Sequence, residues 1–405
     1  MSIFEGVTAR TIGMMTGGAF IAGLARLYGA DDSTAGLIGA VPVLAGLVSA
    51  LSSIVFERLP HRKLLIVLCA TAGRLLLAAP IVIPYLTADP DARIGTLLLL
   101  YLAGNLFQFF MLPSAVAWIS DIAPLSIRAR YFAQREGVVI GMATLISLSM
   151  GVVLDVFKNR GDPVTGFTVL FGVVFLLALV NFAIFSRMRE VPHPHPVDPP
   201  RLRDPFVLPF TDRRYRRLLL VITAWSLGYQ TAIPFTSVYL VSGLGLDYTV
   251  AALYTAGMAV VSVLSARLWA RVADRTSWMT LFIGLVLLQA VSCVFWVFTT
   301  RASAPVMLPL SAIATGAMAS GMNMSMLGLM YGYAPERNRT VYMGTLYAVN
   351  GVAGFAGALL GAAVLGLFGM QGTFAVSAGL LMGAAALSAI LFRRPPESGA
   401  ATVIE

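Results

Sequence analysis

Amide and aromatic side chains interrupt three long apolar stretches of the sequence. They are Tyr101, Asn105, Gln108, Trp225, Tyr229, Gln230 and Asn323. Asn105 and Gln108 are three residues apart, so a helix would place them on one face. Such groups form hydrogen bonds and stack on flat rings, and no cluster of a nucleophile with a base accompanies them. They indicate binding, or hydrogen bonds between neighbouring helices, rather than catalysis.

Charged residues between the apolar stretches form a second group of candidates. They are Glu57, Arg58, Arg62, Asp121, Arg130, Arg135 and Asp274. A carboxylate followed by an arginine occurs at Glu57 and again at Asp274, about 217 residues later. Carboxylate and guanidinium groups in short loops can form ion pairs. The recurrence also indicates that the two parts of the chain are related.

The composition decides what kind of elements must position these residues. The chain of 405 residues is 58% apolar and 12% charged, with a mean hydropathy of +0.84. A soluble domain is about a quarter charged, so this chain has too much apolar surface for one aqueous core. A helix that crosses a bilayer needs about 20 apolar residues. The length and composition therefore predict an all-α membrane protein of about twelve transmembrane helices.

Apolar runs divide the chain into two sets of six predicted spans. The predicted spans are residues 8–29, 34–55, 64–86, 94–119, 135–156, 166–186, 218–241, 248–270, 277–299, 304–332, 342–367 and 371–392. The segment between the sets is rich in Pro and Arg, which break helices and resist burial in lipid. We therefore predict a six-helix bundle at 1–186, a cytoplasmic linker at 187–217 and a second six-helix bundle at 218–405.

The positions of the basic residues predict the orientation. With the N-terminus inside, 22 of the 28 Lys and Arg residues fall in cytoplasmic segments and five fall outside. Basic residues in short loops stay on the cytoplasmic side. Both termini are therefore expected in the cytoplasm, with the chain in a cytoplasmic (inner) membrane and no removable signal peptide. Because the net charge of +9 is sorted by loop, it does not indicate a nucleic-acid partner.

The six-plus-six layout and the charged loops resemble the major facilitator superfamily over essentially the whole chain. That family has a loop signature of the form G-x-x-x-D-R-x-G-R-R. Its charged positions are matched here by Glu57, Arg58, Arg62 and Lys63, with Ser53 in place of the glycine. A second copy keeps Asp274 and Arg275, and residues 121–135 look like the family's loop between spans four and five.

The resemblance implies two bundles around a central cavity that opens alternately to each side and is lined by spans 1, 4, 7 and 10. The candidate solute-binding residues are then Tyr101, Asn105, Gln108, Trp225, Tyr229, Gln230 and Asn323. Their amides and rings would suit a neutral or amphipathic organic solute. By the same resemblance, Glu57, Arg58 and Arg62 would form a cytoplasmic ionic latch with Asp121. Asp274 with Arg130 or Arg135 would be its counterpart.

Charges inside the predicted spans bear on coupling to protons. We find no carboxylate in the predicted spans 1, 4, 7 and 10, so coupling would use carboxylates near span ends, such as Asp155, or the charge of the solute itself. Arg74 is the one cation deep in a predicted span, where an unpaired charge is costly. It indicates either a structural pair or snorkelling, or a contact with an anionic solute.

Methionines recur every four residues in the predicted span at 304–332. Thioethers bind cuprous ions, but all three His residues fall in cytoplasmic segments, which favours flexible packing by the methionines. The chain also lacks a phosphate-binding G-x-x-x-x-G-K-[ST] loop. The sequence therefore predicts a monomeric secondary transporter of a small organic solute, with a slight lean to export of an amphipathic compound. It predicts no cofactor, no resident metal and no enzymatic activity. Uptake of a sugar, metabolite or metal, or a non-transporting or lipid-handling role, are the alternatives.

Overall fold

The computed structural model describes residues 1–56, 59, 61–122, 128–190, 203–335 and 339–392. This part of the chain consists of helices and short loops, without a β-strand. The helices of four or more residues are α1 (Ser2–Met15), α2 (Gly18–Leu27), α3 (Asp32–Ala45), α4 (Ser49–Phe56), α5 (Lys63–Ala78), η2 (Ala79–Val82), α6 (Ile83–Leu86), α7 (Pro90–Ile122), α8 (Arg128–Asn159), α9 (Pro163–Arg187), α10 (Asp204–Thr211), α11 (Arg213–Val238), η3 (Tyr239–Gly243), α12 (Tyr248–Ala273), α13 (Trp278–Val297), α14 (Ala304–Tyr333) and α15 (Arg339–Leu391). The predicted all-α membrane fold is confirmed.

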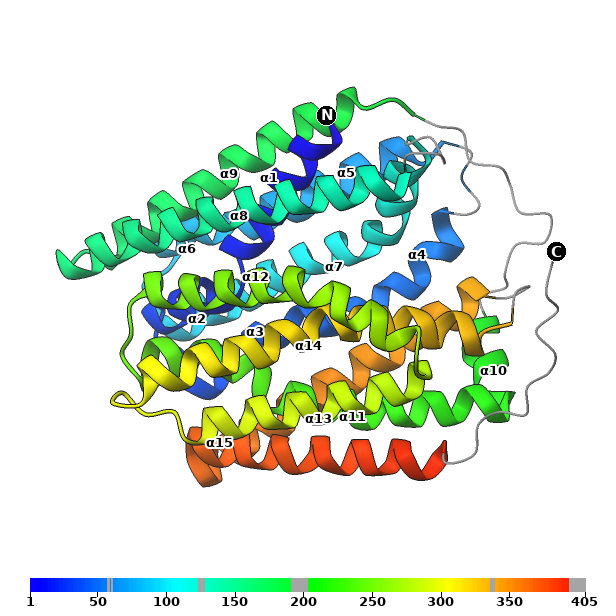
Figure 1. Cartoon of the computed structure of the whole chain (residues 1–405). Coiled ribbons are helices and arrows are strands. Elements are labelled where there is room, and N and C mark those ends of the chain that lie inside the picture. Colours follow the sequence, from blue (N-terminus) through cyan, green and yellow to red (C-terminus); the bar gives the residue numbers. More distant parts are fainter. Residues whose placement is uncertain (57–58, 60, 123–127, 191–202, 336–338, 393–405) are drawn as a thin grey trace.

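The long helices run roughly side by side (Figure 1). We call α1–α9 the first group and α11–α15 the second group. Helix α3 packs against α2 and α7 of its own group and also against α11 and α15 of the second. The second group encloses an apolar core in which Tyr215, Phe282 and Phe374 are fully buried. The first group has cores of its own, one of which contains Ile21 and Phe171. The short helix α10 lies within the predicted linker. The residue boundaries of the predicted halves stay predictions.

Nine helices in the described part of the chain are long and apolar enough to cross a membrane. One of them, α15, changes direction at Gly369, where φ is +70°, so it contains two predicted spans. The shorter apolar helices fall in the first two predicted spans. The nine long helices with α15 counted twice, together with the two stretches that contain the shorter apolar helices, would give twelve crossings. That number stays a prediction.

The first three predicted spans are interrupted rather than continuous. The first divides into α1 and α2 at Gly17 and Gly18, where Gly18 has φ of +52°. Proline causes the other irregularities, because it lacks the N–H that continues a helix. Pro42 lies in α3 just before a 3₁₀ turn, and Pro80 lies in the 3₁₀ helix η2 after α5.

Side-chain caps fix where several helices begin. The carboxylate of Asp31 accepts a hydrogen bond from the N–H of Thr34 at the start of α3. Hydrogen bonding by the side chain of Thr34, together with this N–H, holds the pKa of Asp31 below its usual range. Asp162 caps α9 and Ser277 caps α13 in the same way. The first residue of α1 lies opposite the loops that join α8 to α9 and α13 to α14 (Figure 1). We call the end with those loops the distal end.

Candidate functional site

An ion cluster is buried in the first group of helices. Glu5 of α1 lies between two guanidinium groups: its Oε2 is 3.0 Å from Nη2 of Arg135 on α8, and its Oε1 is 3.5 Å from Nη2 of Arg74 on α5. Asn181 of α9 accepts a hydrogen bond from Arg74 and donates one to Thr8, at 2.6 Å. Glu5 is 5% exposed, Arg74 2% and Asn181 0%. The cluster therefore joins four helices through charges that water barely reaches.

A small residue allows this cluster to close. A Cβ atom at Gly6 would lie 2.6 Å from Nη2 of Arg135, so only glycine lets the guanidinium pass this close to α1. Arg135 also donates from Nε to the carbonyl of Ser2, at 3.1 Å, and from Nη1 to Glu136, at 2.8 Å. With two carboxylates and two guanidinium groups, the formal charges balance.

The cluster changes the sequence interpretation in two places. The predicted first span, residues 8–29, contains no carboxylate, but α1 begins at Ser2 and therefore places the buried Glu5 just ahead of that span, where the apolar run did not reveal it. Arg135 pairs with Glu5 rather than with Asp274, because α1 packs directly against α8. The structural pairing of Arg74, one of its two proposed roles, is confirmed.

The other predicted latch residues are only partly described. Glu57 and Arg58, and the side chains of Asp121 and Arg130, lie outside the described residues. Arg62 is buried at the start of α5, and Asp274 is exposed at the end of α12. The cytoplasmic latch therefore stays a prediction.

A polar contact joins the two helix groups at the distal end. The carboxylate of Asp155, on α8, accepts hydrogen bonds from the backbone N–H groups of Tyr248 and Thr249, both at 2.8 Å, and from the hydroxyl of Thr249. These N–H groups belong to the first turn of α12, and the N–H groups of a first turn have no acceptor within their own helix. Asp155 is only 8% exposed. It therefore caps a helix of the opposite group, where the helix dipole favours a negative charge.

The ring of Tyr248 fills the space beside this cap. Its centroid lies 6.3 Å from that of Phe20, nearly parallel, and 5.8 Å from that of Phe167, edge on. A Cβ atom at Gly23 would overlap the Tyr248 hydroxyl, at 2.1 Å, so α2 can receive the ring only because residue 23 is glycine. Tyr248 is 7% exposed within the core of the first group. We call Asp155, Tyr248 and Thr249 the distal gate.

The predicted solute-binding residues of α7 make their contacts inside the first group. Tyr101 is 3% exposed in the apolar core. Asn105 donates to the carbonyl of Tyr101, at 2.8 Å, and Gln108 donates to the carbonyl of Ala70 on α5, at 3.4 Å. These bonds satisfy part of each amide, and a role in solute contact stays a prediction.

On α11, the structure brings two predicted residues together and adds a third that the sequence did not single out. The rings of Trp225 and Tyr229 are stacked with centroids 5.7 Å apart, and Nε1 of Trp225 donates to Oε1 of Gln289 on α13, at 3.1 Å. Tyr229 and Gln289 line a cavity of about 20 Å³ that also touches Ser292. That volume holds a single water molecule.

Two predicted amides differ from the rest. Gln230 is half-buried and Asn323, on α14, is exposed. Neither makes a hydrogen bond in the part of the chain that the structure describes, whereas Asn105 and Gln108 do. The methionines of α14 behave as packing residues, since Met318, Met322 and Met330 are buried in the second core.

The long apolar helices describe a multi-pass membrane protein with two helix groups, and comparison with known proteins identifies it as a transporter. The sequence model of the Major Facilitator Superfamily matches residues 6–302 and 227–403. The chain therefore belongs to the major facilitator superfamily. No curated protein sequence matches it.

Several solved structures share the fold at low sequence identity. The nucleoside transporter NupG has a TM-score of 0.74 at 14% identity, with 96% of this chain and 99% of that chain covered. A POT family transporter in complex with a thioalcohol-conjugated peptide has 0.73 at 12%, with 96% and 95% covered. A D-xylose-proton symporter has 0.65 at 14%, with 95% and 94% covered. At these identities the likeness shows the fold alone.

Proposed function

We propose that this transporter is an alternating-access secondary carrier of a small organic solute. The observation that carries the proposal is the distal gate, in which a carboxylate of one helix group caps a helix of the other. A contact of this kind can be made and released as the two groups rock against each other. It therefore supports two conformers whose populations a bound solute could shift.

In the described conformer the distal gate is closed. To open that end, Asp155 must leave two N–H groups of α12, and the ring of Tyr248 must leave its site between Phe20 and Phe167. The freed groups would then be hydrated, which offsets part of the loss. With both termini cytoplasmic, as the loop charges favour, the distal end is extracellular and the described conformer faces the cytoplasm. The carrier would work as a monomer in the cytoplasmic membrane.

The solute class is inferred from the groups available to meet it. The rings of Trp225 and Tyr229 are stacked, and the amides of Gln230 and Asn323 form no hydrogen bond with the residues that the structure describes. Together these groups suit an organic molecule with polar groups and a flat or apolar part. The names of the similar structures include a nucleoside transporter, a peptide-bound transporter and a xylose symporter. We favour export of an amphipathic compound over nutrient uptake, because the cavity helices carry many aromatic and Met residues and few charges.

A solute of the folded carrier should raise its melting temperature. At a hundred times its Kd, one ligand adds about 2.7 kcal/mol to the free energy of unfolding. We expect stabilisation of the purified protein in detergent by one class in a panel of nucleosides, sugars, peptides, amphipathic drugs, organic anions and metal ions. Gln230→Ala should abolish the shift, whereas Gln134→Ala, which removes an exposed amide at the start of α8, should keep it.

The outcomes of that panel separate the classes of function. A hit with metal ions alone would replace the organic solute with a metal. A blank panel for a folded, monodisperse protein would contradict the small-solute proposal and favour a lipid-handling role. A shift that survives Gln230→Ala would leave the carrier proposal standing and exclude this amide from the solute site.

The cytoplasmic latch inferred from the loop signature has its own test. Glu57→Gln should slow transport into proteoliposomes and leave the affinity for solute nearly intact, because the latch biases the conformers and does not touch the solute. Asp91→Asn is the control, since Asp91 is an exposed carboxylate outside the predicted latch. A large loss of affinity at an unchanged maximal rate would exclude the latch.

A further inference from the structure

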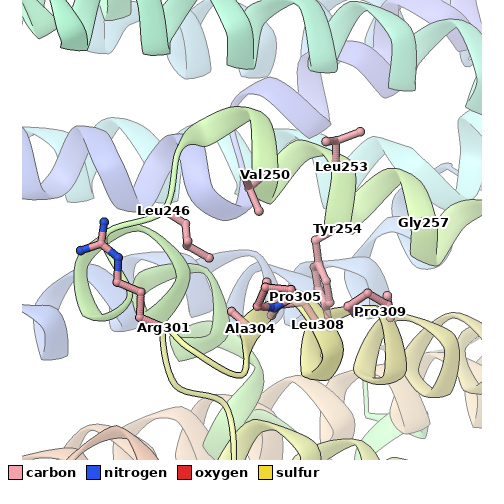
Figure 2. Close-up of a pocket in the computed structure, with 11 residues that line it drawn as sticks. Leu246, Val250, Leu253, Tyr254, Gly257, Arg301, Ala304, Pro305, Leu308 and Pro309 are labelled. Atoms are coloured by element: carbon pink, nitrogen blue, oxygen red, sulfur yellow. The ribbon is translucent and has the colours of Figure 1, made fainter.

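A groove opens between α12 and α14 near the distal end, with a volume of about 460 Å³. Figure 2 shows Val250 and Tyr254 of α12 facing Ala304, Leu308 and Pro309 of α14 across the gap. Every one of these lining groups is apolar except the hydroxyl of Tyr254. The groove lies outside the contacts that form the distal gate.

Small residues explain why the two helices separate here. A Cβ atom at Gly257 would touch the Cβ of Ala312, at 3.9 Å, and one at Gly316 would lie 2.4 Å from the carbonyl oxygen of Met258. The helices are therefore in close contact at Gly316 and diverge toward the distal end. Larger side chains, such as Leu308 and Tyr254, stand between them there and leave a wedge-shaped opening.

The groove has one charged end. Arg301, in the loop before α14, lines that end, and Figure 2 shows its guanidinium group turned away from the apolar side chains. Arg301 has no ion pair or hydrogen bond within the described ranges of the chain. Among the residues that line the groove, only Leu246 is followed or preceded in the sequence by a carboxylate residue, Asp247. The carboxylate of Asp247 already pairs with Lys158, at 3.5 Å. The mouth of the groove therefore keeps an uncompensated positive charge.

The depth of the groove matches one leaflet of a bilayer. The lining residues of α14 run from Ala304 to Ala312, which is about 12 Å along a helix at 1.5 Å per residue. Half of a hydrocarbon layer of roughly 30 Å is about 15 Å. Arg301 would then lie at the level of the lipid phosphates. Leu253, which lines the groove, and Ile313, which follows the lining residue Ala312, are 52% and 54% exposed, so this face of the molecule is suited to contact lipid.

We propose that this groove binds an anionic phospholipid of the leaflet at the distal end. One acyl chain fills the wedge between α12 and α14, and Arg301 contacts the phosphate and the negative headgroup. The charge complementarity at Arg301 and the leaflet-length apolar lining favour this occupant over a second copy of the chain or the transported solute. Such a lipid would hold α12, the helix that Asp155 caps, against α14.

Native mass spectrometry of the purified protein with phosphatidylglycerol or phosphatidylethanolamine tests the proposal. We expect tighter binding of phosphatidylglycerol. Arg301→Gln should weaken that binding about fivefold, as expected for one cation at a membrane surface. Arg160→Gln, which removes another exposed cation at the distal end, should leave it unchanged. Val250→Trp, which fills the groove, should reduce binding of the phospholipid while Arg301 remains.

Each alternative outcome contradicts the proposal. Equal effects of Arg301→Gln and Arg160→Gln would mean that the lipid is held by general surface charge. Equal binding of the two phospholipids would exclude an anionic headgroup as the determinant. Unchanged binding to Val250→Trp, with the protein folded by circular dichroism, would place the acyl chain elsewhere. A dimer mass that is lost in Val250→Trp would identify a second copy of the chain as the occupant.

Discussion

Glu5→Gln should destabilise the folded protein by about 3 to 5 kcal/mol, the range measured when one partner of a buried ion pair is removed. The carboxylate of Glu5 faces Arg74 and Arg135 at 3.5 and 3.0 Å. Without that negative charge, Arg74 has neutral polar partners but no charged one among the described residues. The measurement is the free energy of unfolding of the purified protein in detergent.

Glu136→Gln is the matched control, because its carboxylate contacts the same Arg135 but is 51% exposed. An exposed pair is worth about 1 kcal/mol or less, so this variant should unfold close to the wild type. Glu5→Leu combined with Arg74→Leu should recover part of the loss, since both charges leave together. If Glu5→Gln is as stable as Glu136→Gln, the cluster does not support the fold.

Local features of the sequence were sufficient to predict the helices. The predicted span at 248–270 is α12, and the predicted span at 304–332 is α14, with ends that agree within three residues. Apolar run length and capping residues are local properties, so they can be read along the chain. The interruption of the first three spans was missed, because a single Gly or Pro in an apolar run does not say whether the helix bends or continues.

The functional contacts depend on partners that are distant in sequence. Glu5 and Arg135 are 130 residues apart, and Asp155 and Tyr248 are 93 apart. Neither carboxylate carries a motif, and Glu5 precedes the first visible apolar run. One signal was available for Glu5: Arg74 lies deep in a predicted span, where a structural pair with a buried carboxylate is one of the ways to stabilise its charge. The amides of α7 were visible in the sequence, but their partners were not. An amide in an apolar run can bind a solute or a neighbouring helix, and the sequence does not distinguish these roles.

The distal gate should control the balance between the conformers that are closed and open at the distal end. Asp155→Asn removes the negative charge that caps α12, and a charge at a helix terminus in a partly buried site is worth up to about 2 kcal/mol. That energy corresponds to about a thirtyfold change in an equilibrium constant. We therefore expect the ratio of protein open at the distal end to protein closed there to rise by up to about thirtyfold. The transport rate should change as well, because transport requires both conformers.

Distance measurements between spin labels at Arg160→Cys and Arg301→Cys, in a chain whose Cys69 and Cys293 are replaced by Ala, report this opening. Asp162→Asn is the control, because Asp162 is also an N-cap at the distal end but caps α9 within its own group. Gly23→Ala offers an independent test: its methyl group would collide with the Tyr248 hydroxyl and should open the same end without altering any charge. If Asp155→Asn and Asp162→Asn give the same distances, Asp155 does not hold the distal end closed. If only Gly23→Ala lengthens them, the Tyr248 ring rather than the helix cap keeps the gate shut.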